Sequence, residues 1–123
     1  MPVTLLALYR RPEGGDEALA TFRRRYATEH LPLVRRTPGL RALEVAKVVH
    51  AFNETDVVLV ARMQFDDRAA LDEGLGSEPM RAAGRSLREI APGLATLLVV
   101  EPDLELDPGG GLPASPERPI DVP

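Results

Sequence analysis

Residues 2–10 read PVTLLALYR, and both alternating sets of side chains in this stretch are largely apolar. A strand with one face in water alternates apolar and polar residues, whereas a strand covered on both faces is apolar throughout. Residues 57–65, VVLVARMQF, repeat the pattern until Arg62 and Gln64 interrupt one face. We therefore predict two central strands of a β-sheet, at Pro2–Arg10 and Val57–Phe65.

An amphipathic helix is predicted after the first strand. Its apolar stripe recurs at spacings of three and four residues, at Leu19, Phe22, Tyr26 and His30. His30 thus lies on the face that packs against the sheet. We expect the helix to begin near Asp16 and to end near Leu31, because Pro32 disfavours helical geometry in the residue before it.

The rest of the chain predicts two further strands and a second helix that is split. The expected elements are an edge strand at Leu40–His50, helices from Asp67 to Gly76 and from Ser77 to Pro92, and a last strand at Leu94–Val100. The order β-α-β-β-α-β is that of the ferredoxin-like α+β fold, in which helices cover one face of a four-stranded antiparallel sheet. Its other face would be apolar and uncovered, which predicts a homodimer.

Length and composition indicate one small domain. The chain has 123 residues, 44% of them hydrophobic, and contains no cysteine, which favours a cytoplasmic location. Its first residues, Met1-Pro2-Val3-Thr4, show neither the basic segment nor the cleavage site of a signal peptide. No apolar run approaches the roughly 20 residues that span a bilayer. We expect neither export nor a membrane partner.

Charge is distributed unevenly along the chain. Residues 1–102 hold 14 acidic and 14 basic side chains, whereas residues 103–123 hold 5 acidic and 1 basic, so the net charge of -4 belongs to the tail. A neutral body lacks the field that attracts nucleic acid, and we expect no such partner. The tail has five prolines and three glycines, so it should form neither helix nor strand. We predict that it packs on its own body or on the partner subunit, near the arginine-rich first third.

His30 is the main candidate for chemistry. A histidine changes charge near neutral pH, so His30 could be the general acid or base for a small substrate held between helix and sheet. The alternative is a buried neutral histidine that donates to a backbone carbonyl at the helix end. An open cavity beside His30 would favour the first reading, and a filled core would favour the second.

Three further residues are candidates for substrate binding: Tyr9, Tyr26 and Arg62. Either tyrosine could offer its hydroxyl to a ligand or be an ordinary core aromatic residue. Arg62 either lines a pocket or pairs with Glu44 on a neighbouring strand, and the pair is favoured. Two histidines, His30 and His50, without a converging acidic cluster predict no metal site, and no cofactor-binding motif is present.

Several motifs, in this order and spacing, resemble the EthD-like members of the dimeric α+β barrel superfamily over residues 3–101. They are Leu8-Tyr9-Arg10-Arg11-Pro12, Phe22 and Tyr26 leading to His30-Leu31-Pro32-Leu33, Pro38-Gly39-Leu40, Phe65-Asp66-Asp67, Ala69 with Leu71, and Ser77-Glu78-Pro79. Arg62 stands where many relatives carry an acidic residue in the third strand, so an acid/base partner at that position does not carry over.

The resemblance implies a homodimeric domain over residues 1–102, with small cavities between each sheet and its helices. The superfamily includes cofactor-independent monooxygenases, lactone isomerases, polyketide cyclases and haem enzymes. It therefore implies binding of a small organic molecule and does not select among these activities; our own hypothesis is a cofactor-independent oxygenase or isomerase with His30 as acid/base. Two other functions stay open, a ligand-binding protein without chemistry and a dimerisation module.

Overall fold

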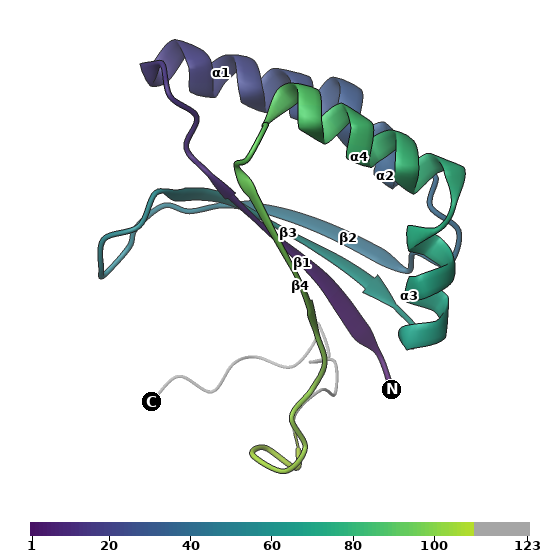
Figure 1. Ribbon diagram of the computed structural model, residues 1–123. Helices are drawn as coiled ribbons and strands as arrows, with labels where there is room; N and C mark the ends of the chain where they lie inside the picture. Colours follow the sequence, from purple (N-terminus) through teal and green to yellow (C-terminus); the bar gives the residue numbers. More distant parts are fainter. Residues whose placement is uncertain (110–123) are drawn as a thin grey trace, which may run out of the picture.

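The computed structural model describes residues 1–109 of the chain (Figure 1). Its elements are β1 (Val3–Arg10), α1 (Gly15–Arg25), the π-helix η1 (Tyr26–His30), α2 (Leu31–Val34), β2 (Ala42–Lys47), β3 (Val57–Phe65), α3 (Arg68–Leu75), α4 (Glu78–Ile90) and β4 (Ala95–Val100). The predicted β-α-β-β-α-β order and the split second helix are confirmed. No helix in this described part is both long and apolar enough to cross a membrane.

The four strands form one antiparallel sheet in the order β2-β3-β1-β4. The two strands that are apolar on both faces, β1 and β3, are central and pair with each other from Val3 opposite Phe65 onward. The strand with mixed faces, β2, is at one edge, as its charged residues predicted. The fold class is therefore the ferredoxin-like α+β arrangement.

The helices cover one face of this sheet and leave the other open (Figure 1). Along β1 every second residue is buried against the helices, and the residues between them are half-buried on the open face. The same alternation runs along β3. The helix-side residues of both strands form the core with side chains from the helices: Val3, Leu5, Ala7, Tyr9, Phe22, Tyr26, Val34, Leu59, Ala61, Met63, Phe65, Leu71, Ala83 and Ala91.

The open face carries a group of aliphatic side chains at its centre. Alternation and strand register place its aliphatic residues in neighbouring rows: Leu6, Leu8, Val58, Val60, Leu98 and Val100. The edge strand β4 is also uncovered on its helix side, since Leu97 is 54% exposed and Val99 is 43% exposed. The apolar open face on which the dimer prediction rests is therefore present in the folded chain.

The first helix is longer than predicted. It does not end near Leu31, because the chain stays helical through Pro32 as far as Val34. The backbone N–H of Leu31 bonds to the carbonyl of Tyr26, five residues earlier, in the wide π turn. A proline ring clashes with the carbonyl four residues before it in a regular helix, and a wider turn just upstream relieves that clash. The prediction missed this because it treated Pro32 only as a helix terminator.

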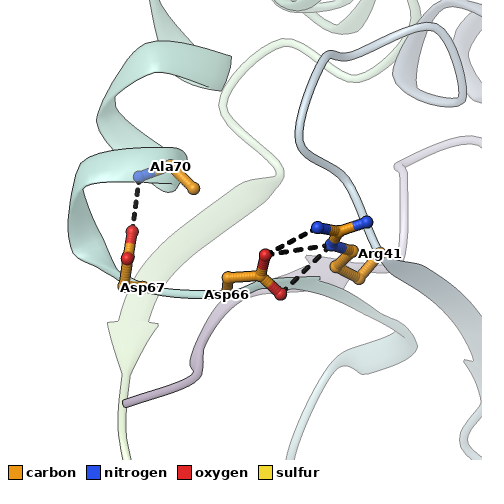
Figure 2. A network of polar contacts seen from close by, with 4 residues as sticks. All are labelled: Arg41, Asp66, Asp67 and Ala70. Atoms are coloured by element: carbon orange, nitrogen blue, oxygen red, sulfur yellow. Dashed lines mark hydrogen bonds and ion pairs between the residues drawn. The ribbon is translucent and has the colours of Figure 1, made fainter.

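The motif Phe65-Asp66-Asp67 joins β3 to α3 (Figure 2). Asp67 caps α3, as predicted, by accepting a 2.8 Å hydrogen bond from the backbone N–H of Ala70. Asp66 pairs with the guanidinium of Arg41, Nη2 to Oδ2 at 2.7 Å, and this hydrogen-bonded cation lowers the pKa of the Asp66 carboxyl. Ser77 caps α4 in the same way through the backbone N–H of Met80.

The edge strand β2 is shorter than predicted, and the chain after β4 forms a turn. The edge strand β2 covers only Ala42–Lys47, since past Val48 the chain leaves the sheet in an exposed loop. After β4 the described chain makes one turn, in which Asp103 Oδ1 accepts from the backbone N–H of Leu106 at 3.0 Å. Residues 110–123, with most of the predicted tail, lie outside the described residues.

Candidate functional site

The fold brings together three of the four predicted site residues. Tyr9 projects from β1 toward the helices, and Tyr26 and His30 lie one turn apart at the two ends of η1. The ring centroids of Tyr9 and Tyr26 are 5.0 Å apart, as are those of Tyr26 and His30. The Tyr26 hydroxyl donates to the Tyr9 hydroxyl at 3.2 Å. These residues form a polar cluster inside an otherwise apolar core.

Burial keeps both tyrosines protonated. The exposed fractions of Tyr9 and Tyr26 are 1% and 3%. Loss of solvation raises the pKa of Tyr9, although its hydrogen bond from Tyr26 acts in the opposite direction. Burial raises the pKa of Tyr26 further, and its contact with Tyr9 adds to the rise. Because Tyr26 uses its proton on Tyr9, the proton of the Tyr9 hydroxyl is the one left to donate.

His30 is held neutral by the same burial. It is 5% exposed, and desolvation lowers the pKa of its imidazole, while a backbone hydrogen bond with Ala83 on α4 raises it in part. Within residues 1–109, Nδ1 of His30 is buried without a hydrogen-bond partner. Burial thus favours the neutral ring, and Nδ1 is left without a partner in the described part of the chain.

Arg62 lies away from this cluster, on the open face of the sheet. It is directly opposite Glu44 on β2, and the two side chains form an ion pair with Nε to Oε1 at 3.7 Å. The favoured reading of Arg62 as half of an ion pair is confirmed. Arg62 and Glu44 also line a shallow cavity of about 230 Å³ with Gln64. Any ligand at Arg62 is thus separated from His30 by the thickness of the sheet.

Metal ligands do not converge in the part of the chain that the structure describes. Across residues 1–109, no three His, Asp or Glu side chains are grouped so that they could hold an ion. His50 lies exposed beyond β2, where its ring packs edge-on against Phe52 with centroids 5.0 Å apart. It is therefore no part of the cluster around His30.

A groove reaches the core beside the polar cluster. It has a volume of about 390 Å³ and runs between α1 and the end of α4, lined by Pro12, Gly14, Glu17, Ala18, Thr21, Phe22, Arg25 and Ile90. The Phe22 ring at its base lies 6.0 Å from the ring of Tyr9 and 5.7 Å from that of Tyr26. His30 is not among the lining residues, and in the single chain the ring contacts from the groove to His30 run from Phe22 to Tyr26 and from Tyr26 to His30.

The sequence prediction missed this groove and one buried hydroxyl. The groove forms where two helices about 70 residues apart in sequence lie side by side, and single-sequence periodicity does not show such a contact. The hydroxyl is Oγ of Ser86 on α4, which is buried without a hydrogen-bond partner among the described residues. The sequence indicates this hydroxyl by its position, because Ser86 lies between Ala83 and Leu87, two residues of the apolar stripe of α4.

The fold and the buried cluster define a class of protein: a ferredoxin-like α+β domain with one open sheet face and a polar site beneath its helices. Among solved structures, an ethyl tert-butyl ether D (EthD) family protein from Bacillus halodurans C-125 is 32% identical, with a TM-score of 0.74. The match covers 84% of this chain and all (100%) of that one. The chain belongs to the EthD family.

More distant structures share the fold. A dimeric ferredoxin-like protein of unknown function from Jannaschia sp. CCS1 is 20% identical with a TM-score of 0.62, over 82% of this chain and 99% of that one. SnoaB, a cofactor-independent oxygenase from Streptomyces nogalater, is 17% identical with a TM-score of 0.54, over 82% of this chain and 92% of that one. No family model matches the sequence, and no curated protein matches it.

Proposed function

We propose that this EthD-family protein is a homodimer that binds a small organic molecule between its helices and its sheet. The observation that carries the proposal is the polar cluster of Tyr9, Tyr26 and His30, in which a buried imidazole nitrogen has no partner within residues 1–109. Leaving a buried polar atom unpaired costs about 1–3 kcal/mol. A ligand that pairs with it removes that cost.

The groove at Phe22 gives such a ligand a place to bind. Its volume of about 390 Å³ falls within the range of small-molecule sites, roughly 300–1,000 Å³. Phe22 lines the groove, and its ring centroid is 5.7 Å from that of Tyr26. We propose that the ligand reaches the cluster from this groove by displacing the Phe22 ring.

The chemistry that we propose for the cluster is proton transfer. A neutral His30 can take a proton from a bound substrate on its unprotonated ring nitrogen, and Tyr9 can donate a hydrogen bond to the oxygen on which charge develops. These roles fit a cofactor-independent oxygenase or isomerase. SnoaB is an oxygenase of that kind on the same fold, which supports the proposal only as an analogy.

A second candidate is a binding or dimerisation module without chemistry. The close packing of His30, which is only 5% exposed, favours it. The two candidates differ in the role of His30. Replacing a purely structural histidine should not change ligand affinity, whereas replacing a ligand-binding histidine should weaken it.

Dimerisation through the open face is part of the proposal. Its central rows carry aliphatic side chains on three adjacent strands, and soluble monomers rarely expose an apolar patch of this kind. A second copy of the chain covers both patches at once about a two-fold axis. We expect each subunit to bury about 800 Å² or more, as specific interfaces do.

The experiment compares the two histidines. Ligands found in an NMR screen of small organic compounds are titrated into the unmodified protein, His30→Gln and His50→Gln. We expect His30→Gln to weaken binding at least about tenfold with the dimer and its melting curve nearly intact, and His50→Gln to change neither. Equal affinities in all three proteins, or a large loss of stability in His30→Gln without an effect on binding, would refute the ligand role of His30.

A further inference from the structure

The loop between β2 and β3 carries two apolar side chains into solvent. Val49 is 82% exposed and Phe52 is 94% exposed. The hairpin continues as far as the 2.9 Å hydrogen bond from the backbone N–H of Val48 to the carbonyl of Val58. Residues 49–56, which we call the arm, extend beyond the sheet and bend away from the helices, toward its open side (Figure 1). The arm thus presents an apolar tip on the side where a second subunit would pack.

An apolar groove opens at the other edge of the sheet, between α4 and β4. It lies on the helix side, has a volume of about 250 Å³, and is lined by residues that include Gly84, Leu87, Arg88, Ala91 and Leu97. Leu97 is 54% exposed in its wall. Gly84 leaves the groove open, because outside its own backbone a Cβ there would meet only the guanidinium of Arg88, at 3.8 Å. A subunit packed flat on the open face would not cover this groove.

The arm and the groove lie at the same end of the sheet but at opposite edges. β3 begins where β1 ends, with Val57 opposite Arg10, and β4 begins there too, with Ala95 opposite Tyr9. The strand order β2-β3-β1-β4 puts β2 and β4 three strand spacings apart, roughly 14 Å. The arm also bends away from the side on which the groove opens. It therefore does not fill the groove of its own chain.

A two-fold axis parallel to the strands, between two open faces, brings an arm and a groove together. Such an axis keeps corresponding strand ends at the same end and sets β2 of one copy opposite β4 of the other. The arm then points past the edge of the partner's β4, to the side on which that groove opens. Because the interface is isologous, each of the two arms meets one groove.

Charge is complementary between the two surfaces. Arg88 lines the groove, whereas the arm carries Glu54 and Asp56 and neither lysine nor arginine. Among the ion pairs within residues 1–109, none includes Arg88 or Glu54. Two residues of extended chain span about 7 Å, so an arm with Phe52 in the groove brings Glu54 to the rim where Arg88 lies.

We propose that the arm of each subunit inserts Phe52 into the groove between α4 and β4 of the other subunit, with Glu54 facing the partner subunit's Arg88. The inference rests on the homodimer of the proposed function and specifies how its two copies hold each other. It also explains how the dimer covers the helix side of β4, an edge strand, Ala95–Val100, without a charged side chain to protect it.

The absence of cysteine from the chain allows a direct test by cross-linking. In the double variant Phe52→Cys with Gly84→Cys, we expect oxidation at micromolar concentration to convert most of the protein to a disulfide-linked dimer on a non-reducing gel. The control is Phe52→Cys with Thr28→Cys, because Thr28 is exposed on η1 and does not line the groove. Equal cross-linking in the two variants, or none in the first, would overturn the proposal.

The strength of the dimer provides a second readout, by sedimentation equilibrium. We expect Phe52→Ser, and Gly84→Leu, which fills the groove at a position where leucine favours helix, to raise the dissociation constant roughly tenfold or more. Leu106→Ser changes an apolar residue that is 84% exposed outside the arm and should leave it unchanged. An unchanged constant in Phe52→Ser or Gly84→Leu would overturn the arm contact and leave the dimer standing, whereas a monomeric unmodified protein would refute both.

Discussion

The two faces of the sheet differ in how well a single chain buries their side chains. On the helix side, β1 presents Leu5 and Tyr9, which are 5% and 1% exposed. On the open side the same strand presents Leu6 and Leu8, which are only half-buried. The sequence makes both faces apolar, but the chain has helices for one. A single chain thus completes a core with a polar cluster inside it, while the other face stays open in the single chain.

We expect the largest effect on stability from shortening a side chain on the helix side of the sheet. Leu5→Ala removes a buried side chain from the closed core and should cost about 2–5 kcal/mol in the free energy of unfolding. Leu8→Ala, three residues along the same strand, is the matched change on the open face. Urea denaturation at two protein concentrations should show a concentration-independent loss for Leu5→Ala. A loss as large for Leu8→Ala in dilute, monomeric protein would contradict the contrast between the faces.

The next effect concerns assembly. Leu8→Asp places a charge in the middle of the open face, where a partner subunit would bury it. We expect the dimer dissociation constant to rise on the order of 100-fold with the helical content unchanged. Light scattering at micromolar concentration should then give a particle near the 13.4 kDa of the single chain instead of about twice that mass. A monomeric unmodified protein would refute the dimer itself.

A smaller effect tests the buried histidine against pH. Burial lowers the pKa of His30 below its ordinary value of 6.5, so between the two values the unfolded chain binds more protons than the folded one. The stabilising effect of the neutral ring is complete above about pH 6.5 and declines as the pH falls toward the folded pKa. Thermal melts from about pH 5 to pH 8 should show this decline in the unmodified protein. It should persist in His50→Gln and be reduced in His30→Gln; an equal slope in all three proteins would argue against a buried neutral His30.

The smallest effect is expected at the charged end of the open face. The side chains of Arg62 and Glu44 are 59% and 71% exposed, and solvent-exposed pairs contribute about 0–1 kcal/mol. Arg62→Ala should therefore change the urea midpoint of dilute protein very little. If the same substitution weakens the dimer or ligand binding severalfold, Arg62 faces a partner or a ligand, and its predicted role in substrate binding gains support. The double variant, Arg62→Ala with Glu44→Ala, shows whether an effect comes from loss of the ion pair or from the Glu44 charge that the single variant leaves unpaired.

The sequence by itself determined the order of elements and the sheet. Two strands apolar on both sides had to be central, a strand with Glu44 and Lys47 suited an edge, and Asp67 and Ser77 marked the helix starts that they cap. These features depend on residues near one another in the chain, through alternation, capping and turn geometry. The spacing of Tyr26 and His30 also placed both on one helix face.

Tertiary structure alone decided what surrounds those residues. It set Tyr9 from a strand against Tyr26 from a helix, brought Ala83 of α4 next to His30, and buried the hydroxyl of Ser86 without a partner among the described residues. It also carried the helix past Pro32 through a π turn and put Arg62 on the other side of the sheet from His30. The reason is physical: local propensity follows from neighbours in sequence, whereas burial and hydrogen-bond pairing depend on which distant segments pack together.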